Sequence, residues 1–302
     1  MATYYRQRFL SSKRQRQRLY ASFLLAFLTL SSSAKANTLF YQPLNMDEAI
    51  TDTRWKADTH YLHNQGVSAG VVQWTQYGDE TFGGETGWLA ARLNLWMKTS
   101  PLWLGLYSDP NYFSLIDVPA DEQYAYLNTL LQKNRNVLAN WQPWIDANKE
   151  RVLGIYLPFE LSDYYFQSAV SQHQLNSVLA TFVQTVDYPV AISVFINGAM
   201  DPDTFADWLV SIQKTGVKVW LQNGRGTDAL SQETIQRYMD VLPCDVGIID
   251  EIFHQESASP FKARPMTKTE KQKAQITAEA CHPHLTFSFR YWRPMPFPLP
   301  IP

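Results

Sequence analysis

The sequence predicts an α/β protein folded as a single (β/α)8 barrel of the TIM type, and three observations support this prediction. Short apolar runs alternate with longer runs of helical periodicity along most of the chain. Eight of the apolar runs resemble strands, which is the number of strands in such a barrel. The chain of 302 residues is also long enough for one barrel, which usually takes about 250 residues. No linker divides the chain. A doubly wound open sheet is the alternative, but it requires a glycine-rich turn after its first strand, and residues 41–45 contain no glycine.

The expected strands are rich in β-branched and aromatic residues, as is typical of parallel strands buried on both faces. They cover residues 39–43, 68–74, 103–107, 152–157, 190–196, 217–222, 245–249 and 285–289. The expected helices lie between them, at residues 47–65, 87–98, 121–148, 168–186, 202–215, 231–241 and 267–280. Asp201-Pro202 and Ser231 are capping residues at the starts of two of these helices.

The two ends of the chain are not expected to belong to the barrel. Residues 1–36 contain a basic stretch, an apolar run and the small-x-small motif Ala34-Lys35-Ala36, which together indicate a secretory signal peptide cleaved after Ala36. An uncleaved anchor is less favoured, because the apolar run is shorter than the about 20 residues that span a bilayer. Residues 37–293 would then form the barrel, and the Pro-rich residues 294–302 an extended arm.

Charge limits the possible partners. Residues 1–36 hold 7 of the 26 basic residues and none of the 28 acidic ones, which leaves 19 against 28, or a net charge of about −9. Such a chain is not expected to bind nucleic acid or anionic lipid. We expect a periplasmic or secreted protein with no membrane span in the mature chain. No cofactor is expected. The glycine-rich residues 222–227 do not match a P-loop and are interpreted as a tight turn rather than a phosphate site.

Residues that directly follow the strands converge at one mouth of a barrel. In this chain they are aromatic, amide and carboxylate side chains, which suit a sugar because flat rings cover its C–H face and planar polar groups bond its hydroxyls. A glycan is therefore the expected substrate. The residues predicted to bind it are Gln42, Trp74, Tyr107, Asn197, Gln222, Asn223 and Trp292.

Two glutamates at the mouth indicate the chemistry. Glu160 follows the fourth strand and Glu251 follows the seventh, and these strands face each other across a barrel. Glycosidic hydrolysis requires one acid that protonates the leaving oxygen and a second carboxylate on the other side of the anomeric carbon. We expect Glu160 to be the general acid/base and Glu251 the nucleophile or base. A carboxylate separation of about 5 Å would retain the anomeric configuration, which is the favoured expectation, whereas about 6.5–9.5 Å would invert it.

Other constellations are weaker. Asp250 competes with Glu251 for its role, since successive strand residues point to opposite faces and only one of the two should face the mouth. His60 and His63 have the spacing of metal ligands, but no third ligand is in view, so no metal is expected. No Gly-x-Ser-x-Gly motif is present, which argues against a serine hydrolase.

Three motifs resemble an uncharacterised bacterial family of glycoside-hydrolase-like barrels, the domain-of-unknown-function family 4434. They are residues 154–160, 220–226 and 250–253, and the similarity extends over most of the mature chain. The resemblance implies a hydrolase-type site that uses Glu160 and Glu251. Asn223 stands where the family has Asp, and Phe159 stands where the large retaining clan of glycosidase barrels has Asn.

The resulting hypothesis is an exported glycoside hydrolase that acts on a polysaccharide or oligosaccharide. The two departures at Phe159 and Asn223 leave an alternative open, a non-catalytic carbohydrate-binding barrel that handles exopolysaccharide or cell-envelope glycan.

The two cysteines offer a separate test of the fold. Cys244 precedes the seventh expected strand and Cys281 precedes the eighth, so both should lie at the bottom rim of neighbouring strands. Strands about 4.8 Å apart bring Cα atoms within the range of a disulfide, and export would supply an oxidising setting. We therefore expect a disulfide between Cys244 and Cys281, and two buried thiols are the alternative.

Overall fold

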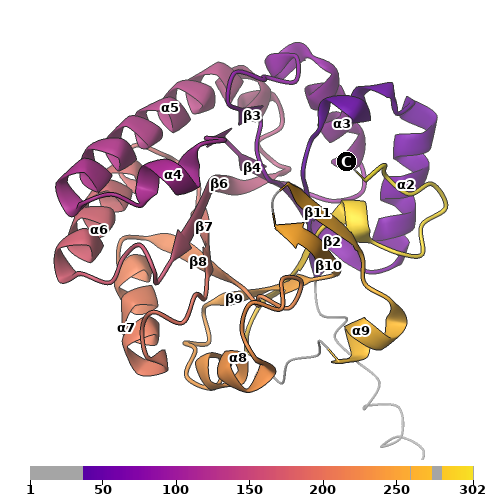
Figure 1. Cartoon of the computed structure of the whole chain (residues 1–302). Coiled ribbons are helices and arrows are strands. Elements are labelled where there is room, and N and C mark those ends of the chain that lie inside the picture. Colours follow the sequence, from indigo (N-terminus) through magenta and orange to yellow (C-terminus); the bar gives the residue numbers. More distant parts are fainter. Residues whose placement is uncertain (1–36, 259, 274–280, 302) are drawn as a thin grey trace, which may run out of the picture. The chain divides into compact units, whose positions relative to one another are not determined.

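Eight parallel strands close into a barrel, which confirms the predicted fold (Figure 1). The computed structural model describes residues 37–258, 260–273 and 281–301, so the expected signal peptide lies outside the described residues. The strands follow one another around the barrel in the order β1-β12-β9-β8-β7-β6-β4-β2. Their bounds are β1 Asn37–Tyr41, β2 Val67–Val72, β4 Leu102–Gly105, β6 Val152–Ser162, β7 Val190–Phe195, β8 Val217–Gln222, β9 Gly247–Glu251 and β12 His284–Phe287.

Helices surround the barrel (Figure 1). On α7, for example, Phe205, Trp208, Leu209 and Ile212 recur at helical spacing and are all buried. Asp201 and Ser231 cap the helices that they were predicted to cap. The α-helices are α2 Asp52–Asn64, α3 Trp88–Trp96, α4 Tyr112–Ile116, α5 Ala120–Ala147, α6 Ala169–Val183, α7 Pro202–Gln213, α8 Gln232–Met239 and α9 Lys268–Lys273.

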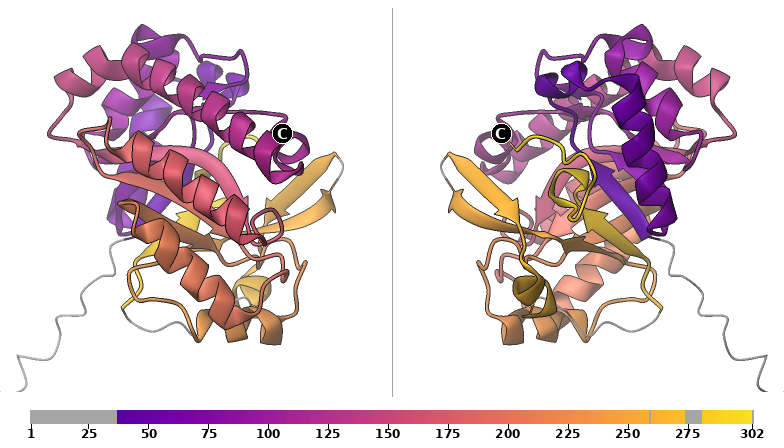
Figure 2. Two further views of the ribbon diagram at one scale, coloured as in Figure 1. Left: turned by 90° about the vertical axis from the view of Figure 1, so that its left-hand side faces the viewer. Right: turned by 90° about the vertical axis from the view of Figure 1, so that its right-hand side faces the viewer.

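Small elements decorate the carboxyl end of the barrel, where the strands end. The hairpin of β10 (Phe253–Ala258) and β11 (Phe261–Pro265) is antiparallel and projects from this end (Figure 2). Two short strands, β3 (Gln76–Tyr77) and β5 (Tyr107–Ser108), pair with each other. The remaining elements are single 3₁₀ turns, namely η1 Asn45–Ala49, η2 Gly84–Thr86 and η3 Phe289–Tyr291.

Several boundaries differ from the prediction. The predicted helix 47–65 begins as the 3₁₀ turn η1, and α2 starts only after Thr51, whose hydroxyl accepts a hydrogen bond from the backbone N–H of Arg54. The seventh strand lies two residues further along than predicted and contains Glu251. The hairpin between this strand and α9 was missed. Of the predicted helix 267–280, residues 268–273 are helical and residues 274–280 lie outside the described residues.

The fourth strand is the most informative difference. Leu157 pairs with Ile192, but the next paired residue, Glu160, pairs with Ser193, so Pro158 and Phe159 form a bulge. Proline is tolerated at a bulge because no ladder hydrogen bond is required of it there. The strand therefore continues to Ser162 instead of ending at Leu157, and Glu160 lies within the strand rather than beyond it.

Aromatic rings fill the interior of the barrel. Phe40, Tyr156 and Trp220 contact one another, with ring centroids 5.5 to 5.9 Å apart. Gly154 makes room for Trp103, because a Cβ at this position would lie 2.3 Å from the Trp103 ring. The interior is thus a packed core rather than a pore, and a ligand must bind above it, at the carboxyl end.

The C-terminal arm packs on the barrel. Met295 and Leu299 are buried and belong to the core between the strands and the helices. Arg54 on α2 donates hydrogen bonds to the carbonyl oxygens of Phe297 and Pro298, at 3.3 and 2.6 Å. The arm therefore contributes to the stability of the fold.

Replacing Leu299 with Ala is expected to lower the free energy of unfolding by about 3 kcal/mol, because it removes buried methyl groups and leaves a cavity. Urea unfolding followed by circular dichroism measures this change. Ile301→Ala, at a position that is 38% exposed, is the matched control and should cost less than about 1 kcal/mol. Equal effects of the two changes would contradict an anchored arm.

The two cysteines form a disulfide in the structure. Their Cα atoms are 5.2 Å apart, and the bridge links residues 37 positions apart in the sequence. It connects the segments that lead into β9 and β12, which are neighbours in the barrel. No helix in the part of the chain that the structure describes is long and apolar enough to span a lipid bilayer.

Candidate functional site

A cavity of about 540 Å³ opens at the carboxyl end of the barrel and holds both predicted acids. Glu160 of β6 and Glu251 of β9 line it together. Strand alternation explains this, because inward positions recur every second residue. Ile249 of the interior cluster lies two residues before Glu251, and Glu160 pairs across the bulge with Ser193, two residues after the interior residue Ala191. The other lining residues are Phe113, Phe195, Ile196, Asn197, Gln222, Gly224, Thr227, Ala229, Leu230, Gln255 and Ala258.

The bulge in β6 is held in place below Glu160. The Ser193 hydroxyl donates to the carbonyl oxygen of Phe159 at 3.1 Å and also bonds the Tyr156 hydroxyl at 2.8 Å. All of these groups are buried. Glu160 follows this braced segment directly, so its position on the strand is fixed while its side chain stays partly exposed to the cavity.

A turn after β8 orients Glu251. The backbone N–H of Gly226 donates to Glu251 Oε2 at 2.6 Å. Glycine is required here, because a Cβ on Gly226 would lie 2.6 Å from the ring of Phe253. The turn itself is closed by Asn223, whose Oδ1 accepts from the backbone N–H groups of Arg225 and Glu251 at 3.2 and 3.3 Å.

Asp250 does not share the cavity with Glu251. Its carboxylate accepts a hydrogen bond from Asn223 Nδ2 at 3.2 Å and lies 3.0 Å from His284 Nδ1. Asp250 and His284 lie on outward positions of β9 and β12, and Asn223 directly follows β8. Asn223 is therefore a residue that positions the turn beside Glu251. It is not exposed to a substrate, since only 2% of its surface is accessible.

Burial raises the pKa of both acids. It raises the pKa of Glu160 to about 7, because the buried carboxyl loses the water that would stabilise its charge. Burial also raises the pKa of Glu251 to about 7; the hydrogen bond from Gly226 opposes this, and the charges of Glu160 and Asp250 reinforce it. Two acids with raised pKa values in one cavity are typical of an acid–base site.

The raised pKa of Glu160 makes stability depend on pH. A carboxyl whose pKa is raised in the folded state contributes most to the free energy of unfolding below its unfolded pKa. This stabilising contribution is lost as the pH rises through the folded pKa of about 7. Glu160→Gln should therefore leave stability unchanged at pH 4 and raise it by roughly 2 kcal/mol at pH 8. Urea unfolding at both pH values tests this. Glu150→Gln, at an exposed position, should show no such difference.

Of the predicted substrate-binding residues, some line the cavity that contains the two acids and the others do not. Asn197 and Gln222 line the cavity with the two acids. Asn223 and Trp74 are buried, and the Trp74 indole donates to the carbonyl oxygen of Pro43 at 3.1 Å. Trp292 packs against the core between strands and helices. The carbonyl oxygen of Gln42 accepts from Arg290 at 3.0 Å.

Tyr107 lies at a different cavity. Its hydroxyl accepts a hydrogen bond from Lys133 Nζ at 3.0 Å, and it lines a cavity of about 170 Å³ with Gln76 and Asn136. In residues 37–258, 260–273 and 281–301, no group of three or more His, Cys, Asp or Glu side chains could hold a metal ion.

The sequence analysis missed the aromatic wall of the cavity. Phe113 of α4 is 49% exposed, and its ring lies edge-on to Phe195 with 6.4 Å between centroids. Phe195 ends β7 at an inward position, so strand alternation could have found it. Phe113 belongs to a helix within a strand–helix connection, and no periodic signal indicates where such a residue points.

Comparisons with known proteins agree with the fold and the motifs. The chain is 29% identical over 290 residues to the uncharacterized protein YbcH of Escherichia coli (strain K12), covering 91% of this chain and 96% of that protein. A solved structure from Bacteroides thetaiotaomicron VPI-5482, described as a "putative alpha-L-fucosidase", aligns with a TM-score of 0.61 and 13% identity over 85% of this chain and 88% of its own. At that identity the likeness shows the fold alone.

The family model described as "Domain of unknown function (DUF4434)" matches residues 37–297, nearly the whole of the part that forms the barrel and its arm. This match confirms the resemblance seen in the motifs around Glu160, Asn223 and Glu251. The chain belongs to the DUF4434 family.

Proposed function

We propose that the protein is an exported glycoside hydrolase that cleaves a polysaccharide or oligosaccharide, with Glu160 as general acid/base and Glu251 as nucleophile or base. One observation carries the proposal: the two glutamates come from β6 and β9 and line the same cavity at the carboxyl end of the barrel. Both have raised pKa values caused mainly by burial. This is the pair of groups that glycosidic hydrolysis requires.

Their hydrogen bonds support different roles for the two acids. The Gly226 N–H donates to Glu251 and favours its ionised form, which a nucleophile or base requires. Within the described residues, no hydrogen bond to the Glu160 carboxyl opposes the effect of burial. The two carboxyls also interact, since the charge of Glu160 contributes to the raised pKa of Glu251 and two nearby carboxylates resist a second negative charge, so the pair favours holding one proton. Glu160 can then donate a proton to the leaving oxygen.

The walls of the cavity suit a sugar ring. Phe113 and Phe195 provide apolar faces, while Asn197, Gln222 and Gln255 provide amides for hydroxyl groups. Export is supported by residues 1–36, which have the composition of a signal peptide, and by the disulfide, which is typical of an oxidising compartment. The name of the fold neighbour from Bacteroides thetaiotaomicron agrees with a glycosidase, although the likeness is one of fold.

Incubation of the purified protein with a panel of bacterial exopolysaccharides and their oligosaccharides tests the proposal. We expect release of new reducing ends from at least one glycan, and none with Glu160→Gln. Proton NMR of the first product should show the anomer of the substrate if the enzyme is retaining, and the opposite anomer if it is inverting. Binding of a glycan that the wild-type protein never cleaves would instead support the non-catalytic barrel.

A further inference from the structure

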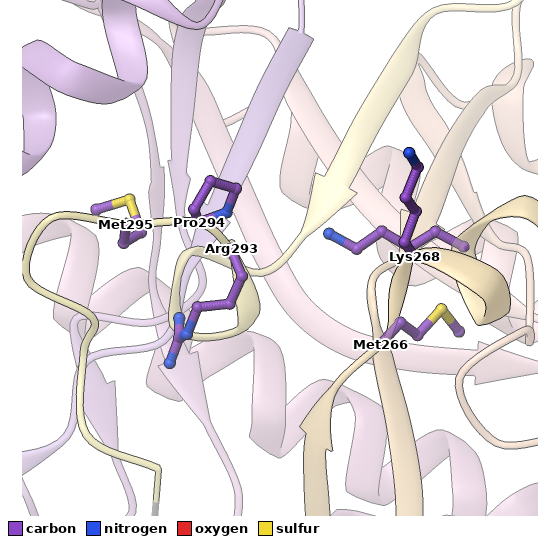
Figure 3. A pocket seen from close by; sticks show the side chains of 6 residues that line it. Met266, Lys268, Arg293, Pro294 and Met295 are labelled. Atoms are coloured by element: carbon purple, nitrogen blue, oxygen red, sulfur yellow. The ribbon is translucent and has the colours of Figure 1, made fainter.

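A second cavity lies between α9 and the segment that follows β12, and it has a different chemistry from the first. Its volume is about 610 Å³, and it is lined by Met266, Lys268, Lys271, Arg293, Pro294 and Met295. Figure 3 shows Arg293, Pro294 and Met295 on one side and Lys268 and Met266 on the other. The lining thus combines three cationic groups with apolar side chains, and among the described residues it contains no acid.

The three cations have no acidic partner within the part of the chain that the structure describes. Arg293 donates to the carbonyl oxygens of Arg290 and Trp292, at 3.0 and 2.7 Å, and to no carboxylate. The acid on the same helix, Glu270, is paired with Arg264 at 2.7 Å and does not line the cavity. Burial lowers the pKa of Lys271, and the charge of Arg293 lowers it further, so the two cations repel each other. An anion between them would relieve this repulsion.

Positive charge is also concentrated in the sequence here. Residues 261–273 contain Lys262, Arg264, Lys268, Lys271 and Lys273 but the single acid Glu270, in a chain whose formal net charge is −2. Such a local excess raises the concentration of anions near the cavity.

Hydrogen bonds connect this cavity to the site of the two glutamates. Ile252, the neighbour of Glu251, donates to the carbonyl oxygen of Phe287 at the end of β12 and accepts from the backbone N–H of Met266, both at 3.0 Å. Met266 lines the cationic cavity. The hairpin between Ile252 and Met266 contributes Gln255 and Ala258 to the first cavity. The segment from Ile252 to Met266 therefore contributes to the walls of both cavities.

We propose that this cationic cavity binds the carboxylate of an acidic sugar, so that the substrate is an acidic glycan that extends from the two glutamates across the base of the β10–β11 hairpin. The assignment of the glycan rests on the proposed function, whereas the preference for an anion rests on the cavity itself. Two lysines and an arginine would supply charge-assisted hydrogen bonds, and the methionines would contact the sugar ring.

Calorimetric binding of alginate, polygalacturonate and hyaluronate, with neutral dextran as reference, tests this proposal. At least one polyuronate should bind, with an affinity that falls as salt increases. The double variant Lys268→Glu with Lys271→Glu should bind it at least about tenfold more weakly. The matched control, Lys262→Glu with Lys273→Glu, makes the same change in net charge outside the cavity lining and should change the affinity less than about twofold.

Three results would overturn the proposal: no polyuronate binds, the two double variants weaken binding equally, or vesicles of anionic phospholipid bind and polyuronates do not. Glu160→Gln separates this proposal from the proposed function, because it should keep full affinity for the polyuronate while losing hydrolysis. Binding that depends on Lys268 and Lys271 without any cleavage would support the cationic site and reject the hydrolase.

Discussion

Glu160→Gln and Glu251→Gln should each lower the rate of glycan hydrolysis by roughly a thousandfold, with the fold intact. General acid–base catalysis contributes about 10²–10⁴ in rate, and a glutamine in place of Glu160 has no proton to donate to the leaving oxygen. A glutamine at position 251 cannot attack or activate water. Initial rates on the cleaved glycan, together with circular dichroism of each variant, measure this effect.

The pH dependence of these rates distinguishes the two roles. Wild-type activity should follow a bell, which falls at low pH as Glu251 is protonated and at high pH as Glu160 ionises, with limbs around the raised pKa values of about 7. The residual activity of Glu160→Gln should lack the alkaline limb. An unchanged alkaline limb would contradict the assignment of the acid.

Asp250→Asn is the control that the structure offers for Glu251. Asp250 is the next residue, but it binds Asn223 and His284 and does not line the cavity. Asparagine can still accept the bond from Asn223, so we expect less than about a tenfold loss of rate. If Asp250→Asn were as damaging as Glu251→Gln, Glu251 would not be the second catalytic carboxylate.

Loss of the disulfide should destabilise the protein by about 4 kcal/mol. The bridge joins residues 37 positions apart, and the chain-entropy model assigns about this value to a loop of that length. It is a large part of the about 5–15 kcal/mol that stabilises a typical domain. Guanidinium unfolding of the double variant Cys244→Ser with Cys281→Ser, compared with the wild type, measures the change.

The reducing agent provides the control for this experiment. Wild-type protein unfolded in its presence should match the double variant, and the double variant itself should not respond to it. Mass spectrometry of the unreduced protein should find no free thiol. Two titratable thiols in the native protein would contradict the bridge.

Most of the fold could be predicted because its signals are local. Each barrel strand is an apolar run and each long helix has its own periodicity, so β7 and β8 were placed within a residue. The β10–β11 hairpin was missed because its exposed strands bury few residues and lack a continuous apolar run. The bulge at Pro158 could not be predicted, since it depends on Ser193, which is distant in sequence and donates a hydrogen bond to the carbonyl oxygen of Phe159.

The candidate site could be predicted only in part. The carboxyl ends of the strands were predicted to meet at one edge of the barrel. Four residues chosen on this basis line one cavity in the structure: Glu160, Glu251, Asn197 and Gln222. The direction of a side chain in a loop is set by tertiary contacts. Trp74 turns to the carbonyl of Pro43, and this could not be inferred from its position after a strand.

The disulfide has a consequence for resistance to proteolysis. Cys244 and Cys281 close a covalent ring that contains β9, the projecting hairpin and α9, and therefore Glu251 and the two lysines of the cationic cavity. Exposed loop tips are the preferred sites of proteolytic cleavage. A cut between β10 and β11 would leave the two fragments joined through the bridge, so a single nick by a protease need not detach the segment that contains Glu251.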